Sequence, residues 1–144
     1  MALMEVNRRM VARADQVLTR YADSLYRADG VEFAQMNCGG WKSRRSAEAQ
    51  EIGRYAPNPQ IREKWTVRLV TRRLDGSLIT DTEGTYSVRK YELPIAVEEA
   101  IEDMYSGEKA IVLAPWYCAY GLRGNEYVAG YENVIFEVTL GEKK

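Results

Sequence analysis

The feature that most constrains the fold is a period-two alternation of apolar and polar residues in the second half of the chain. One such segment begins at Trp65 and ends at the Asp75-Gly76 pair, and a second covers residues 134–140. Alternation of this kind predicts strands that bury one face of a sheet, and Asp-Gly between strands is a hairpin signal. The buried face of the first strand carries Trp65, Val67, Leu69 and Thr71, and that of the last carries Val134, Phe136, Val138 and Leu140.

Two helices are predicted outside these strands. Residues 3–28 repeat apolar side chains at spacings of three and four, and Asp29-Gly30 ends the segment. This apolar stripe consists of Met10, Ala14, Val17, Leu18, Tyr21 and Leu25. Because the stripe is narrow, we expect the helix to lie against the body of the domain or against a partner. Pro94 opens a second, short helix, whose solvent side is expected to carry Glu98, Glu99, Glu102 and Asp103.

The other segments are assigned from turn residues and short apolar runs. Strands are expected at residues 31–37, 86–91 and 109–114, with a turn at residues 81–84. Residues 42–60 are polar and contain Pro57-Asn58-Pro59, so they predict a surface loop with room for one helical turn. The Arg44-Arg45 pair in this loop could contact an anion, but solvated side chains are favoured.

The order of these elements sets the fold class. One N-terminal helix, then strands in series with a single inserted helix, indicates an α+β fold with an antiparallel sheet wrapped on a helix. Strands and helices do not alternate strictly, and no glycine-rich phosphate loop of the usual spacing is present. A doubly wound dinucleotide-binding fold is therefore not expected.

Composition excludes several function classes. With 20 basic and 21 acidic residues the net charge is −1, which gives no electrostatic footprint for nucleic acid. The chain has no histidine, the commonest general base and zinc ligand, and two cysteines are too few for a structural zinc site or a disulfide framework. We expect no metal and no cofactor. Cys38 and Cys118 could form one bridge, but two buried thiols are favoured.

No apolar run reaches the length of a membrane-spanning helix, and no signal peptide is visible in the first ten residues. A cytoplasmic protein is expected if the chain starts at its natural first residue. If a leader was removed, the compartment is hidden.

Several motifs then occur in a familiar order. The stretch Met104-Tyr105-Ser106-Gly107-Glu108-Lys109-Ala110 leads to Ala119-Tyr120-Gly121 and to Val134-Ile135-Phe136-Glu137-Val138. This order resembles the C-terminal half of an FKBP-type peptidyl-prolyl isomerase domain, which reads M-x-x-G-x-K-A, then A-Y-G, then L-V-F-x-V-x-L. Upstream, the strand ending in Leu74-Asp75-Gly76 and the helix segment Glu98-Glu99-Ala100 are similar to the family's L-D-G and W-E-E-A. The similarity spans residues 65–140.

The resemblance implies an FKBP-like antiparallel half-barrel sheet wrapped on one short helix over residues 31–144, with a helical extension at residues 1–30. The extension, beginning Val6-Asn7-Arg8, and Gly40-Trp41 are also similar to the prefix of FKBP-like lipoproteins of gliding-type bacteria of the Bacteroidetes type. That similarity implies a periplasmic or membrane-anchored lipoprotein if a leader was removed.

The family's chemistry needs no acid, base or metal. A hydrophobic pocket holds the proline ring and desolvates the Xaa-Pro amide, whose twisted state has lost its resonance charge separation. The resemblance places Tyr120 as the carbonyl-binding tyrosine, Phe136 as a wall phenylalanine, Val128 as a loop aliphatic, and Leu93 and Pro94 as residues that bind backbone. It also places Val97 at the pocket-floor tryptophan, Leu69 at a wall tyrosine and Ile79 at a phenylalanine. Thr80 stands where an aspartate is usual, and Val128-Ala129-Gly130 replaces the I-P-P loop tip.

Loss of these aromatic residues argues for a degenerate pocket that binds a peptide or protein partner with weak or no isomerase activity. The alternative is an active isomerase or folding helper, and a third hypothesis is an adaptor that uses the apolar stripe of the N-terminal helix. Without the resemblance, the alternation of its strand favours Phe136 as a core residue over a pocket residue. The Tyr120 hydroxyl could then simply hydrogen-bond within its own glycine-flanked loop. Trp116-Tyr117 is either an exposed platform or, as we favour, packed on Trp65.

Overall fold

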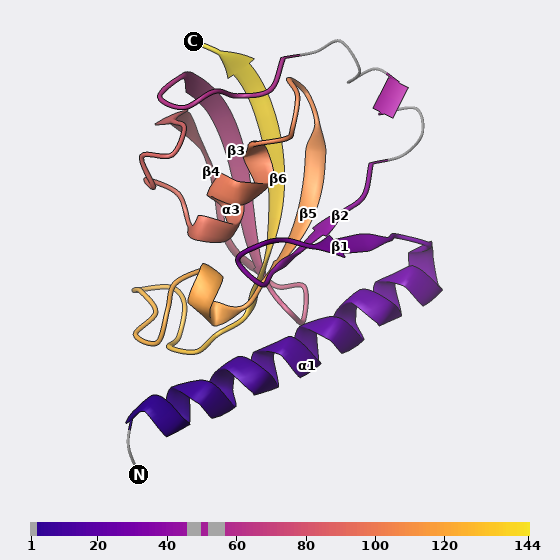
Figure 1. The fold of residues 1–144 in the computed structure, drawn as a ribbon, viewed down its shortest axis with the longest axis vertical. Coiled ribbons are helices and arrows are strands. Elements are labelled where there is room, and N and C mark those ends of the chain that lie inside the picture. The colour runs from indigo at the N-terminus through magenta and orange to yellow at the C-terminus, as the bar shows by residue number, and fades with distance from the viewer. Residues whose placement is uncertain (1–2, 46–49, 52–56) are drawn as a thin grey trace.

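Alternating apolar residues form the centre of an antiparallel sheet in the computed structural model, which describes residues 3–45, 50–51 and 57–144. Six strands within these residues pair in the order β1-β2-β5-β6-β3-β4, every pair antiparallel (Figure 1). Their bounds are Phe33–Gln35 (β1), Trp41–Ser43 (β2), Lys64–Arg73 (β3), Leu78–Ser87 (β4), Lys109–Ala114 (β5) and Val134–Lys143 (β6). The predicted α+β class and the open sheet wrapped on a short helix are confirmed.

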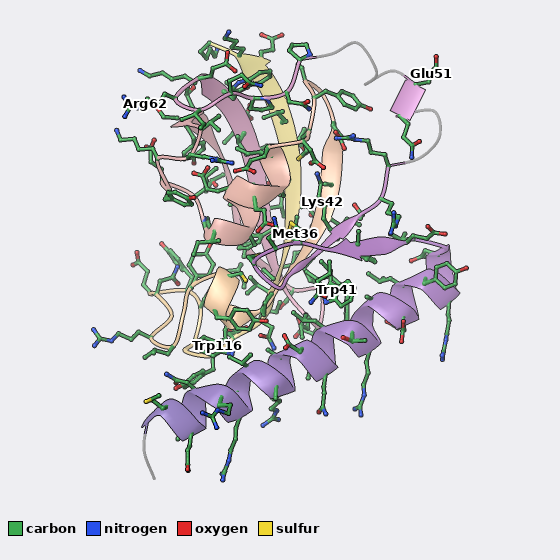
Figure 2. The ribbon with its side chains drawn as sticks, viewed as in Figure 1. Met36, Trp41, Lys42, Glu51, Arg62 and Trp116 are labelled. Atoms are coloured by element: carbon green, nitrogen blue, oxygen red, sulfur yellow. The ribbon has the colours of Figure 1, made fainter. Side chains whose placement is uncertain are left out.

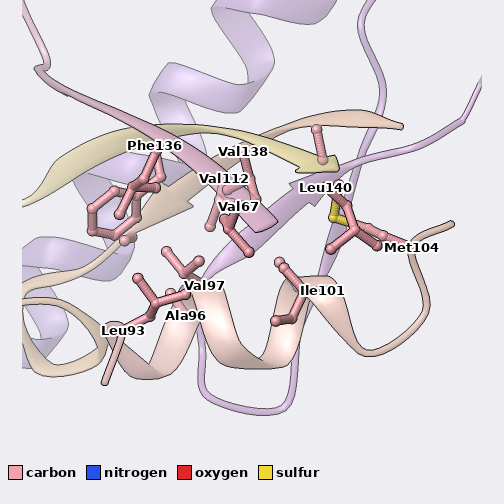
Figure 3. Close-up of a cluster of buried hydrophobic side chains, with 14 of the residues drawn as sticks. Val67, Leu93, Ala96, Val97, Ile101, Met104, Val112, Phe136, Val138 and Leu140 are labelled. Atoms are coloured by element: carbon pink, nitrogen blue, oxygen red, sulfur yellow. The ribbon is translucent and has the colours of Figure 1, made fainter. Parts of the chain in front are cut away.

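The short helix α3, Ile95–Ile101, lies across one face of this sheet (Figure 1). The predicted face of β6 is buried as expected, from Val134 to Leu140, and so are the β3 residues Val67, Leu69 and Thr71 opposite it. The helix contributes Ala96, Val97 and Ile101 to the same cluster of buried side chains (Figure 3). Each such aliphatic side chain, removed fully from water, contributes roughly 1.5–3 kcal/mol. This cluster is the main core.

The N-terminal helix α1, Leu3–Asp29, confirms the predicted helix and lies diagonally across the base of the sheet (Figure 1). It ends where Gly30, at a φ of +70°, donates its N–H to the Tyr26 carbonyl at 2.9 Å, a left-handed helix end. Leu18 is buried with Leu113 and Ile135 of the sheet. The helix therefore packs on its own domain. No helix among the described residues, this one included, is long and apolar enough to span a membrane.

Two predictions in the middle of the chain are wrong. Residues 81–84 are not a turn and no separate strand follows, because β4 runs unbroken from Leu78 to Ser87 beside β3. Because β4 is an edge strand with one neighbour and mostly solvated side chains, its polar composition does not interrupt the ladder. The chain turns instead at Arg89 and Tyr91, which both have positive φ.

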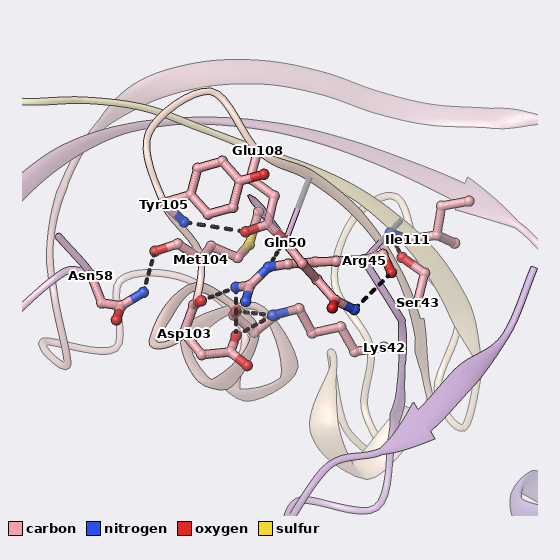
Figure 4. Close-up of polar contacts among 11 residues, drawn as sticks. Lys42, Ser43, Arg45, Gln50, Asn58, Asp103, Met104, Tyr105, Glu108 and Ile111 are labelled. Carbon is pink, nitrogen blue, oxygen red and sulfur yellow. Dashed lines mark hydrogen bonds and ion pairs between the residues drawn. The ribbon is translucent and has the colours of Figure 1, made fainter. Parts of the chain in front are cut away.

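The predicted loop at residues 42–60 begins inside the sheet. Lys42 belongs to β2 and pairs with Val112 of β5. Arg45 is not a solvated side chain, since its Nε donates to the buried carboxylate of Glu108 at 2.8 Å. Lys42 and Arg45 both form ion pairs with Asp103, beyond the end of α3 (Figure 4). These contacts tie the N-terminal hairpin to the helix. The helical turn allowed for in this loop falls mostly on residues 46–49 and 52–56, which lie outside the described residues.

Candidate functional site

Strand register places the predicted site residues at one end of the core. Phe136 of β6 lies directly opposite Thr71 of β3, and the ring of Tyr120 meets that of Phe136 edge-on at a centroid distance of 6.0 Å. Five predicted site residues are buried members of one cluster, namely Leu69, Leu93, Val97, Val128 and Phe136, and Ile79 and Tyr120 pack against it. Pro94 follows Leu93 at the start of α3, where its carbonyl accepts the N–H of Val97 at 2.9 Å. The structure thus brings the predicted residues together.

The depth of burial divides these residues into a floor and a rim. Val97 and Phe136 have no exposed surface, and Val128 has only 2%. Tyr120 and Ile79 are only partly buried, so they form the side that solvent reaches. A molecule approaching this end meets Tyr120 and Ile79 above an apolar floor, and Tyr86 is also partly buried against the same cluster.

Thr71 is the residue of this site that sequence reasoning missed. Its side chain is wholly buried, and its Oγ1 has no regular hydrogen-bond partner among the described residues. It is nevertheless near enough to the Tyr120 phenol to lower the pKa of that group, against the larger rise that burial causes. Tyr120 therefore stays protonated and can donate a hydrogen bond. Its described contacts are with Thr71 of β3 and Phe136 of β6, in contrast to the alternative that it bonds its own loop. The sequence feature that could have revealed Thr71 as a site residue is its polar side chain on the otherwise apolar face of β3.

The loop that carries Tyr120 is held by α1. Trp116 in the single-turn helix η1 (Trp116–Cys118) donates its Nε1–H to the Met10 carbonyl at 3.1 Å, as its position against α1 suggests in Figure 2. The hydroxyl of Tyr117 donates to Asp15 at 2.6 Å, and burial raises the pKa of that phenol. Trp116 also packs edge-on against Tyr131 at 4.8 Å.

The packing expected for Trp116 is confirmed, but its expected partner Trp65 is wrong. Trp65 lies opposite Lys143, whereas Trp116 follows the other end of the sheet, where Ala114 pairs with Val134. The strand lengths therefore separate the two indole rings.

Val128 is fixed by the local chemistry of its own loop. The side-chain Oδ1 of Asn125 accepts the N–H groups of Tyr127 and Val128, each at 2.8 Å, in an Asx-type turn. Gly124, at a φ of +67°, passes so close to Val128 that a side chain there would collide with its carbonyl oxygen. The loop thereby turns Val128 inward although the family's I-P-P tip is missing.

Glu98 was expected on the solvent side of α3, and this is wrong. Its side chain is buried, with Oε2 accepting the N–H of Arg89 at 3.1 Å and Oε1 lacking a partner among the described residues. Burial raises the pKa of Glu98, and the nearby N–H groups of Arg89, Leu93 and Tyr91 offset part of that rise. The carboxylate holds the left-handed turn that leads into Leu93 and Pro94, so it positions one wall of the site.

Glu99, the next residue, is also engaged and not simply solvated. Its carboxylate accepts the N–H groups of Asn37 and Cys38, the latter at 2.9 Å. Helical periodicity assigns both glutamates to solvent, but the turns at residues 36–40 and 88–93 cover the two flanks of this short helix. Among the described residues no group of three or more acidic or cysteine side chains could hold a metal ion.

Two cavities of about 510 Å³ lie elsewhere on the molecule. One is between the β1–β2 hairpin and α3, where Lys42, Glu99 and Asp103 line it. The other is on the outer face of the sheet beside the ion pairs of Arg68 with Asp81 and Arg72 with Glu137. None of the eight predicted site residues lines either cavity.

Two solved structures show a similar fold. A peptidyl-prolyl cis-trans isomerase from Pseudomonas syringae pv. tomato superposes with a TM-score of 0.67 at 17% identity, covering 92% of this chain and 95% of its own. FkpA from Escherichia coli gives a TM-score of 0.70 at 16% identity, covering 96% of this chain and 64% of its own. At such identities the likeness establishes the fold. No curated protein sequence matches the chain.

The family follows from the sequence itself. Residues 56–141, more than half of the chain, match the family described as FKBP-type peptidyl-prolyl cis-trans isomerase. This stretch contains β3, β4, α3, β5, all but the last two residues of β6, and all eight predicted site residues. The chain therefore belongs to the FKBP-type peptidyl-prolyl cis-trans isomerase family.

Proposed function

We propose that this domain binds a peptide or protein partner at the Tyr120 end of its core, with weak or no prolyl isomerase activity. The observation that carries the proposal is the closed floor: Val97, at the position of the family's tryptophan, has no exposed surface. Aliphatic Leu69 and Ile79 also stand where the family has aromatic rings.

Catalysis of this kind depends on the shape of the floor. The barrier to rotation about a peptide bond is roughly 18–20 kcal/mol, and it falls when a pocket holds the twisted amide better than the planar one. That requires a cavity that accepts the proline ring and excludes water from the amide. A valine buried beneath its neighbours offers neither an open floor nor an aromatic face.

Binding requires less than catalysis. The half-buried phenol of Tyr120 can donate to a carbonyl of an extended peptide, and burial keeps that phenol protonated by raising its pKa. Ile79 supplies partly exposed apolar surface beside it. These groups suit a chain segment that lies over the rim without entering the core.

The test combines turnover and binding. Isomerisation of an Xaa-Pro peptide by this protein should stay close to the uncatalysed rate, while an active family member under the same conditions accelerates it. A proline-containing peptide should still shift the amide resonances of residues near Tyr120. Tyr120→Phe should weaken that binding, whereas Tyr26→Phe, the same change at an exposed position on α1, should leave it unaltered. Turnover comparable to the active member, abolished by Tyr120→Phe or Phe136→Ala, would refute the proposal.

The second candidate is an active isomerase or folding helper. It is favoured by the 6.0 Å approach of Tyr120 and Phe136, two aromatic residues that the family resemblance retains. Leu93 and Pro94, at the start of α3, are retained as well. Under this hypothesis the protein turns over Xaa-Pro peptides or slows the aggregation of an unfolded client. If it does neither, the hypothesis has no support.

Other parts of the hypothesis stay predictions. We propose residues 1–30 as a helical extension of a domain at residues 31–144, with a periplasmic or lipoprotein origin if a leader precedes it. Cell fractionation of the full gene product tests the second point. The adaptor hypothesis is weakened because Ala14 and Leu18 of the apolar stripe are buried on the chain's own sheet and loop.

A further inference from the structure

The two cysteines meet although 80 positions separate them in sequence. Cys38 lies in the turn between β1 and β2, and Cys118 is the last residue of η1. The Sγ of Cys118 donates to the carbonyl oxygen of Cys38 at 2.8 Å, and both residues are free thiols. The function proposed above makes no use of this pair.

Both thiols are held in place by their surroundings. The N–H of Cys38 donates to the Glu99 carboxylate at 2.9 Å, which fixes the turn on α3. Gly39 has a φ of +106°, and a Cβ there would come within 2.7 Å of the Tyr117 hydroxyl, so the turn packs closely on the segment that bears Cys118. Cys118 is 1% exposed, whereas Cys38 is only half-buried.

The two sulfur atoms differ in their chemistry. The neighbouring Cys118 thiol lowers the pKa of Cys38, aided by the N–H of Gly40 and opposed by burial and by Glu99. The same pairing raises the pKa of Cys118, as does its burial. The accessible thiol is therefore the one that ionises first, which is the arrangement that thiol–disulfide exchange requires.

We propose that Cys38 and Cys118 form a redox-active pair that a small disulfide, glutathione disulfide, converts into an intramolecular disulfide bond. The Cys38 thiolate attacks one sulfur of glutathione disulfide, whose S–S bond breaks and releases one glutathione. Cys118 then gives up its proton and attacks the Cys38 sulfur of the mixed disulfide, releasing the second glutathione. Two protein thiols are oxidised, one glutathione disulfide is reduced to two thiols, and the two protons end on the released glutathione molecules.

The new bond would join the β1–β2 turn to η1, and Tyr120 follows Cys118 by two residues. Oxidation would therefore fix the loop of Tyr120 on the flank of α3 that Glu99 already holds. The proposal rests on the thiol geometry and stands independently of whether the Tyr120 end catalyses isomerisation.

The test uses the folded, reduced, full-length protein incubated with glutathione disulfide, followed by alkylation of free thiols and mass spectrometry. We expect a monomer that has lost two hydrogens and one cross-linked peptide pair containing Cys38 and Cys118. Cys118→Ser should hold a stable glutathione adduct on Cys38, because no second thiol resolves it. Cys38→Ser should acquire an adduct only after unfolding. A lasting adduct on the wild-type protein, a link between two molecules, or no reaction in the folded state would overturn the proposal.

A second measurement does not depend on variants. Alkylation of the folded wild-type protein by iodoacetamide should label Cys38 at least about tenfold faster than Cys118, since thiolate fraction and access both favour Cys38. Equal rates would contradict the assigned order of attack. Circular dichroism before and after oxidation confirms that the fold is retained.

Discussion

The two ends of the core beneath α3 are equally buried but differ in chemistry. At one end Ile101, Met104 and Leu140 are at most 1% exposed (Figure 3), and the buried carboxylate next to them, that of Glu108, is paired with Arg45. At the other end, around Val97 and Phe136, burial is the same, but the neighbourhood includes Thr71 and Glu98. These two residues hold the buried side-chain oxygen atoms that lack partners within the described part of the chain.

The apolar packing of the first end is what stability requires. The buried, unpaired oxygen atoms of the second end are not explained by stability alone. A buried polar atom without a partner costs roughly 1–3 kcal/mol. At Thr71 an apolar residue of the same shape would avoid that cost, whereas at Glu98 it would also remove the acceptor of the Arg89 N–H. The unpaired oxygens lie at the end that holds Tyr120, the end to which the proposed function assigns the partner.

The largest expected effect comes from the apolar end. Ile101→Ala should lower the free energy of unfolding by about 2–5 kcal/mol, because it removes buried methyl groups and leaves a cavity. Urea denaturation followed by tryptophan fluorescence measures this loss. Ile95→Ala, in the same helix but half exposed, should change stability by less than about 0.5 kcal/mol and serves as the control. Equal effects at the two positions would mean that this end is not closely packed.

A smaller effect of opposite sign is expected at the other end. Thr71→Val keeps the shape of the side chain and removes the unpartnered hydroxyl, so stability should rise by about 1–2 kcal/mol. Thr82→Val, at an exposed position of the edge strand β4, is the matched substitution and should be nearly neutral. A loss of stability in Thr71→Val would show that the hydroxyl has a partner after all.

The next prediction concerns pH. Because the folded protein raises the pKa of Glu98 above its ordinary value of 4.5, the folded state holds this proton more tightly than the unfolded chain. The contribution of Glu98 to stability is therefore fully present below pH 4.5 and declines as pH rises through the folded pKa. Glu98→Gln should remove this decline.

The difference in urea midpoint between wild type and variant, measured across this range, isolates the group from other carboxylates. Glu126→Gln, at an exposed glutamate, should leave the pH profile of the wild type unchanged. If wild type and Glu98→Gln keep a constant difference at every pH, the assignment is wrong.

The smallest change in stability is expected for Tyr120→Phe. The ring and its contact with Phe136 remain, and only a half-buried hydroxyl is removed, so the change should stay within about 0.5 kcal/mol. Peptide binding, measured by resonance shifts, should fall nonetheless. A large loss of stability would mean that the Tyr120 hydroxyl makes a stabilising hydrogen bond in the folded protein.

Long elements with one buried side were predictable from the sequence. The alternation of β3 and β6 and the stripe of α1 gave their positions within a few residues, because burial on one face imposes a period on the chain. Tyr120 and Phe136 were placed at one site only through resemblance to a family, since nothing local joins a loop tyrosine to a strand residue.

Other features depend on contacts that periodicity does not contain. Glu98 is buried because the turn at residues 88–93 folds over it, and Trp116 packs on α1 because the loop and helix meet at the base of the sheet. The continuity of β4 comes from its pairing with β3, which overrides its polar composition. Tertiary partners of this kind cannot be inferred from a segment's own residues.

The anchoring of the Tyr120 loop on α1 has a consequence for the mechanics of the domain. The match to the isomerase family begins at residue 56, yet Met10 and Asp15, far upstream of it, hold Trp116 and Tyr117. The helix therefore stabilises the position of the loop that carries Tyr120. Because Trp116 and Tyr117 lie only a few residues before Tyr120, a shift or loss of α1 would disturb the position of Tyr120. A fragment that begins at residue 56 would lack the contacts that set the geometry of its site.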